Sequence, residues 1–157
     1  MTCARRLVAA CGLAVLLGAL AGPVTGAMAS KASIKEAFRS YSSKIAVAEG
    51  HTLTAVGEYK TTKNAAPVEE AITNSIAVIG GLRSKVAHQS AKTPKVKAAK
   101  AKFVKGLKAI IVSYEKLKAA FADKASNPEA AQAEATKALA ALKSGRKLLG
   151  EAVKLLG

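Results

Sequence analysis

Apolar and small residues recur along the chain in alternating steps of three and four, which is the spacing of one face of an α-helix. The pattern runs through residues 32–60, 67–91, 94–122 and 128–156. No segment shows the period of two that is typical of a strand. The positions expected to face inward are Ile34, Phe38, Tyr41, Ile45, Ala48, Thr52, Ala55, Tyr59, Val68, Ile72, Ser75, Ile79, Leu82, Val86, Phe103, Leu107, Ile110, Tyr114, Leu117, Phe121, Ala135, Ala138, Leu142, Gly145, Leu149, Ala152 and Leu156.

The ends of these segments carry helix-start signals. Ser33 followed by Glu36 has the form of a capping box, which places the start of the first helix. Pro67, Pro94 and Pro128 each suit the first turn of a following helix. Four long helices joined by short breaks predict an all-α fold, an antiparallel up-down-up-down four-helix bundle.

Glycines interrupt the helical spacing of apolar residues, or replace large apolar residues in it, in three places. Gly50 predicts a kink or short break in the first helix. Gly80-Gly81 predicts a kink or a close helix contact in the second. The inward face of residues 128–156 is mostly alanine and glycine. It predicts close approach of a neighbouring helix, or else a weakly packed face that detaches.

The first 29 residues have the three-part layout of a secretory signal peptide. Arg5 and Arg6 form the basic start, residues 7–22 are almost all apolar, and Ala27-Met28-Ala29 supplies the small residues that a signal peptidase needs. Cleavage after position 29 leaves one domain, residues 30–157, of 128 residues. We therefore expect a protein that is secreted, extracellular or held in the cell envelope.

Three other interpretations of this leader stay open. Arg5 and Arg6 also suit export by the twin-arginine route rather than the general secretory route. Residues 8–11 resemble a lipidation box, although Cys11 stands inside the apolar run instead of closing it. The run of residues 7–22 would be a short membrane anchor if it were not cleaved.

Removing the leader changes the chemistry of the chain. The two cysteines, Cys3 and Cys11, leave with it, so the mature domain has no disulfide and no thiolate metal site. Loss of Arg5 and Arg6 leaves 23 Lys and Arg against 10 Asp and Glu, a net charge of +13. Such a cationic exported domain indicates an anionic partner, and plain solubility is the alternative explanation.

The sequence contains no catalytic signature. His51 and His88, the two histidines, fall roughly 20 Å apart along the axis of an antiparallel helix pair, so they cannot share a metal ion. Glu69 and Glu70 are adjacent and do not face each other on a helix. We therefore expect no enzymatic activity, no metal site and no cofactor.

Residues 92–108 hold seven lysines and no acidic residue. They occupy the start of a helix, where the backbone dipole is already positive, whereas the other three helices begin with glutamates. Free backbone N–H groups among lysines form an anion site. The candidate anion-binding residues are Lys92, Lys95, Lys97, Lys100, Lys102, Lys105, Lys85, Arg83, Lys31 and Lys35.

In the predicted bundle these residues share one end of the molecule, which would hold 16 basic and two acidic residues. The sequence therefore predicts a protein that binds an anionic cell-envelope polymer or lipid surface. Nucleic acid binding would be non-specific, because aromatic residues are few and lysine dominates. The alternatives are a membrane-active protein using the cationic amphipathic residues 142–156, and a carrier of an apolar ligand between the helices. The pattern does not indicate an oligomeric state.

Overall fold

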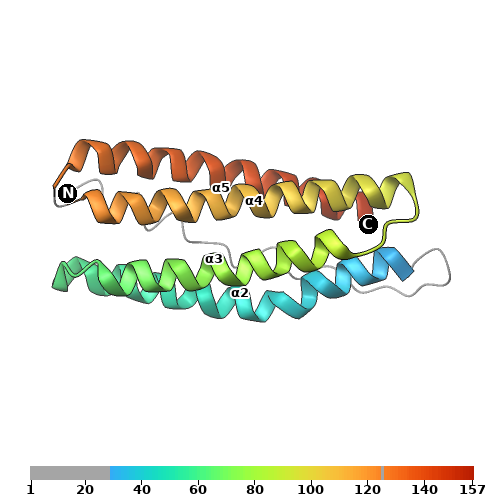
Figure 1. Ribbon diagram of the computed structural model, residues 1–157, viewed down its shortest axis with the longest axis horizontal. Coiled ribbons are helices and arrows are strands. Elements are labelled where there is room, and N and C mark those ends of the chain that lie inside the picture. Colours follow the sequence, from blue (N-terminus) through green and yellow to red (C-terminus); the bar gives the residue numbers. More distant parts are fainter. Residues whose placement is uncertain (1–28, 125) are drawn as a thin grey trace.

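The computed structural model describes residues 29–124 and 126–157. These residues form four helices and no strand (Figure 1), which confirms the all-α prediction. The helices are α2 (Ala29–Thr62), α3 (Ala66–His88), α4 (Pro94–Asp123) and α5 (Pro128–Leu156). Residues 1–28 of the predicted signal peptide lie outside the described part, so it stays a prediction.

Side-chain caps explain two of the helix starts, and backbone conformation explains one helix end. The side chain of Thr93 accepts a hydrogen bond from the Val96 N–H at 3.3 Å, and the side chain of Asn127 accepts one from Ala130 at 3.1 Å. Both are N-caps placed directly before a proline. Lys63 follows α2 with φ of 59°, the left-handed conformation that commonly ends a helix.

Two predictions about α2 need correction: the capping box is wrong and the short break at Gly50 is absent, whereas a kink there stays a prediction. The chain is already helical at Ala29, so Ser33 and Glu36 lie inside the helix and do not cap its start. The helix also runs unbroken through Gly50, where no atom outside its own helix lies within 4 Å of a Cβ position. A single exposed glycine costs a helix only about 1 kcal/mol, which the 34-residue helix withstands.

Helix α3 is shorter than predicted. It ends at His88 rather than at residue 91, because Gln89 is extended with ψ of 140°. The connection must reach Thr93, which is itself extended as the N-cap before Pro94. Gly80 lies inside a continuous helix with no atom within 4 Å of its Cβ position, so close helix contact at this residue is excluded.

Helices that follow each other in the chain lie side by side and run in opposite directions (Figure 1). Between α3 and α4, Lys118 Nζ donates to Thr73 Oγ1 at 3.0 Å and Lys100 Nζ donates to the Gln89 carbonyl at 2.7 Å. Helices α2 and α5, whose contact would close a bundle, approach each other much less closely. The complete up-down-up-down bundle topology therefore stays a prediction.

The closest helix approach is between α4 and α5. A Cβ placed on Gly145 would lie 2.8 Å from the Gly106 carbonyl oxygen and 2.7 Å from Ile110 Cγ1. Such distances are shorter than real Cβ atoms tolerate, so the two backbones touch at these glycines. The close approach predicted from the alanine- and glycine-rich face of residues 128–156 is confirmed.

The core follows the predicted helix faces. Every predicted inward position whose side chain is described is buried, except that Phe38 is only partly buried against the core. The side chain of Tyr41 lies outside the described part. The buried hydroxyls of Thr52 and Ser75 lie 3.1 Å apart, and each is within 3.2 Å of the Ala48 carbonyl oxygen. Their hydrogen-bonding needs are met locally, so they fit an apolar core.

Candidate anion-binding end

Four parts of the chain meet at one end of the molecule: the starts of α2 and α4 and the ends of α3 and α5 (Figure 1). Lys31 at the start of α2 donates to the Gly157 carbonyl at 2.8 Å. Lys102 on α4 forms an ion pair with Glu151 on α5 at 2.5 Å. We call this region the basic end. Its basic residues are Lys31, Lys35, Arg39, Lys44, Arg83, Lys85, Lys92, Lys95, Lys97, Lys100, Lys102, Lys105, Lys143, Arg146, Lys147 and Lys154.

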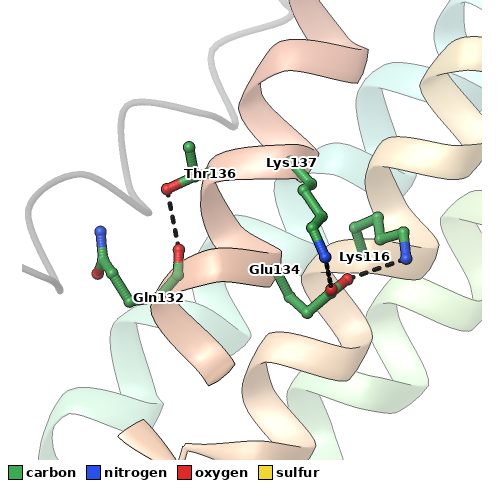
Figure 2. Close-up of polar contacts among 5 residues, drawn as sticks. All are labelled: Lys116, Gln132, Glu134, Thr136 and Lys137. Atoms are coloured by element: carbon green, nitrogen blue, oxygen red, sulfur yellow. Dashed lines mark hydrogen bonds and ion pairs between the residues drawn. The ribbon is translucent and has the colours of Figure 1, made fainter. Parts of the chain in front are cut away.

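Charge is distributed unequally between the two ends. The basic end carries 16 basic residues against Glu36 and Glu151, whereas the other half carries seven basic and eight acidic residues. In that other half, Glu134 accepts ion pairs from Lys116 at 3.0 Å and from Lys137 at 2.6 Å (Figure 2). These hydrogen bonds lower the pKa of Glu134. The excess positive charge therefore lies at the basic end.

Lys31, Lys100 and Lys102 are predicted site residues with structural partners, and Lys85 also interacts within the chain. Lys31 is bonded to the chain's last carbonyl, Lys100 caps the carbonyl of Gln89 just after α3, and Lys102 is paired with Glu151. The pair with Lys102 lowers the pKa of Glu151. Since these ammonium groups already have acceptors, their replacement would disturb the fold as well as any anion binding.

Other predicted site residues are available to a ligand. Lys92, Lys95, Lys97 and Lys105 are exposed, and no hydrogen bond or ion pair joins them to another residue in the described part of the chain. Lys108, about one helical turn beyond Lys105, is also exposed and has no partner among the described residues. The ammonium groups of Lys92, Lys95, Lys97 and Lys105 belong to the basic end, and Lys108 continues their unpaired cationic surface beyond it along α4.

The remaining predicted site residues lie on α2 and α3. Burial lowers the pKa of Lys35, and the nearby charges of Lys31 and Arg39 lower it further. These three residues follow each other at steps of four on one face of α2. Arg83 is half-buried and Lys85 is exposed near the end of α3. Basic residues of the basic end thus lie on α2 and α3 as well as on α4.

The start of α4 itself is a poorer anion site than predicted. Pro94 has no N–H group, and the N–H of Val96 is already bonded to Thr93 Oγ1. Helix α4 is also not unique, because α2 likewise has no acidic residue in its first turn. Fewer free N–H groups than predicted remain at this helix start, so the lysine side chains carry most of its positive charge, and anion binding here stays a prediction.

An open groove of about 720 Å³ lies between the end of α3 with the segment that follows it and the first half of α4. Ala87 and Ala91 line it on one side together with Gln89 and Ser90, and Ala101 and Val104 of α4 line it on the other; we call these four apolar residues its floor. Four lysines border it, namely Lys97, Lys100, Lys105 and Lys108. We call it the lysine groove. It was not predicted from the sequence, since its two walls meet only after α3 and α4 pack together.

The sequence pattern also did not predict that one carboxyl group is buried. Glu49 on α2 is only 5% exposed, and its Oε1 atom has no hydrogen-bond partner in the described residues. Burial raises its pKa to about 7, although the charge of Arg146 on α5 opposes the shift. The signal available in the sequence is position: residue 49 flanks the inward stripe at Ala48 and Thr52.

The geometry bears on the alternative functions. The apolar residues Leu142, Leu149 and Leu156 of α5 are buried in the core, so they are engaged within the molecule. No helix among the described residues has the length and apolar character needed to cross a bilayer. Within the same residues, no three His, Cys, Asp or Glu side chains are grouped to hold a metal ion.

Similarity to known proteins does not help to interpret the basic end and its groove. Comparison of the chain with protein-family models, with curated proteins and with solved structures finds no match in any of the three. The interpretation of this end therefore depends on its own chemistry.

Proposed function

We propose that the mature chain is an exported, non-enzymatic, up-down-up-down four-helix bundle that binds an anionic envelope surface or polymer through the basic end. The observation that carries this proposal is the segregation of charge. Sixteen basic residues stand against two acidic ones at one end, and the opposite end is close to neutral. Solubility alone would favour an even spread of charge over the surface.

The export part of the proposal rests on the leader of residues 1–29. The binding part rests on the exposed lysines of α4, which are free to exchange counterions for a polyanion. Lysine acts on phosphate, sulfate or carboxylate as a point charge, without the planar two-bond geometry of arginine. Binding should therefore be strong at low salt, weak at high salt and insensitive to the sequence of the polymer.

Retention on immobilised heparin against a salt gradient tests this function. We compare the triple variant Lys95→Gln, Lys97→Gln, Lys105→Gln with the wild type. Each lost lysine contact should reduce the slope of log affinity against log salt by about one. The triple variant should therefore elute at clearly lower salt than the wild type.

The control is the triple variant Lys60→Gln, Lys63→Gln, Lys118→Gln, which removes the same charge from the opposite half. Because Lys63 and Lys118 donate hydrogen bonds to the Lys60 carbonyl and to Thr73 Oγ1, circular dichroism must first show that this variant is folded. It should elute close to the wild type. Elution of the wild type at or below physiological salt would contradict the proposed function. Equal losses in the two triple variants would also contradict it, because they would show a response to net charge alone.

A further inference from the structure

The lysine groove combines two surfaces that a purely hydrophilic polyanion does not need together. Ala91 and Val104 on its floor are partly buried and pack against the core, and Ala101 beside them is exposed. An apolar floor of this kind gains free energy only when apolar atoms cover it, about 0.8 kcal/mol for each buried methylene.

The border of the groove is cationic and unpaired. Lys97, Lys105 and Lys108 are exposed and have no partner among the described residues, whereas Lys100 is bonded to the Gln89 carbonyl. No acidic residue is among the described residues that line the groove. Three free ammonium groups around an apolar floor complement a molecule with an anionic group next to a hydrocarbon chain.

We infer that the lysine groove binds an anionic phospholipid of a membrane surface, with an acyl chain on the Ala101 and Val104 floor and the phosphate against the bordering lysines. This inference rests on the proposed function and narrows its partner to a lipid. A volume of about 720 Å³ lies within the range of small-molecule sites. The open side of the groove admits a lipid that stays in the bilayer.

A nucleic acid or a polysaccharide explains the groove less well. The floor has no aromatic side chain on which a base could stack. Hydrated sugars would cover the alanine and valine surface without the free-energy gain that comes from burying apolar atoms against it. Either polymer would use the lysines alone and leave the floor without a role.

Binding to vesicles tests the inference, with heparin retention measured in parallel. The vesicles contain phosphatidylglycerol mixed with phosphatidylcholine, or phosphatidylcholine alone. Ala101→Gln places a polar side chain on the floor while keeping charge and helix propensity. Ala98→Gln is the matched control, because Ala98 is exposed on the same helix but does not line the groove.

We expect Ala101→Gln to weaken binding to the anionic vesicles at least tenfold and to leave heparin retention unchanged. Ala98→Gln should change neither, and vesicles of phosphatidylcholine alone should not bind the wild type. The helical signal in circular dichroism is the check that each variant is folded.

Undiminished vesicle binding by Ala101→Gln would overturn the lipid assignment, and so would a wild type that binds heparin but not anionic vesicles. Both results would leave the proposed function standing, with a polymer as partner. A wild type that binds neither probe would overturn the proposed function itself.

Discussion

Replacing Gly145 by alanine should lower the free energy of unfolding by about 1–3 kcal/mol, the usual cost of overpacking a closed interface. The new Cβ would lie 2.7 Å from Ile110 Cγ1 and 2.8 Å from the Gly106 carbonyl oxygen. A backbone oxygen cannot rotate away as a side chain can. Helices α4 and α5 must therefore separate, which weakens contacts along their whole length. Urea unfolding followed by circular dichroism measures the loss.

The control is Gly150→Ala, one and a half turns further along α5. No atom outside its own helix lies within 4 Å of a Cβ at Gly150. Alanine there should raise stability by about 0.5–1 kcal/mol, because glycine is unfavourable inside a helix. The two substitutions are chemically identical and should have opposite signs. Equal effects of the two would show that α4 and α5 do not touch at Gly145.

Stability should also fall as pH rises from about 4.5 to about 7, through Glu49. Its pKa is raised to about 7 in the folded chain and returns to the ordinary 4.5 on unfolding. Between these values the folded chain holds a proton that the unfolded chain has released, so rising pH favours unfolding. The full contribution is about 3 kcal/mol, present below pH 4.5 and lost by pH 7 to 8.

Glu49→Gln removes this dependence, because the amide stays neutral at every pH. The variant should match the wild type near pH 5 and exceed its stability by up to about 3 kcal/mol at pH 8. Glu58→Gln is the control, since Glu58 is exposed on the same helix. Urea unfolding at several pH values gives the comparison. A constant difference between wild type and Glu49→Gln across this range would contradict the assignment.

The periodic spacing of apolar residues was sufficient to predict four helices and nearly all of their buried faces. This succeeds because each helix buries one stripe, and Ile72, Leu107 and Leu149 stand where a step of three or four repeats. The proline positions predicted the starts of three helices equally well, since a proline in the first turn of a helix loses no hydrogen bond.

Short sequence signals predicted helix starts and breaks poorly where the same residues are compatible with more than one local structure. Ser33 and Glu36 have the spacing of a capping box, but that spacing also occurs inside a helix, where the chain continues from Ala29. Gly50 predicts a kink or a short break, yet α2 continues through it without a break, since an exposed glycine weakens a long helix without ending it. The free-energy difference between ending and continuing a helix at a given residue is small, and the packing of the rest of the fold can outweigh it.

The candidate site was only partly predictable. The lysines of residues 92–108 are evident from the sequence, but their roles differ after folding. Lys100 and Lys102 acquire partners on other parts of the chain, whereas Lys95 and Lys97 do not. These partners and the lysine groove depend on how α3, α4 and α5 lie against one another.

The central claim is that the basic end contacts an anionic partner, and lysine acetylation footprinting tests it most directly. The chain carries 20 lysines spread over all four helices, so both ends are sampled in one experiment. With saturating heparin, Lys92, Lys95 and Lys97 should become protected from acetylation. Lys60 and Lys63, at the other end, should react as in the free protein. Equal protection at both ends, or protection at the end of α2 alone, would contradict the account.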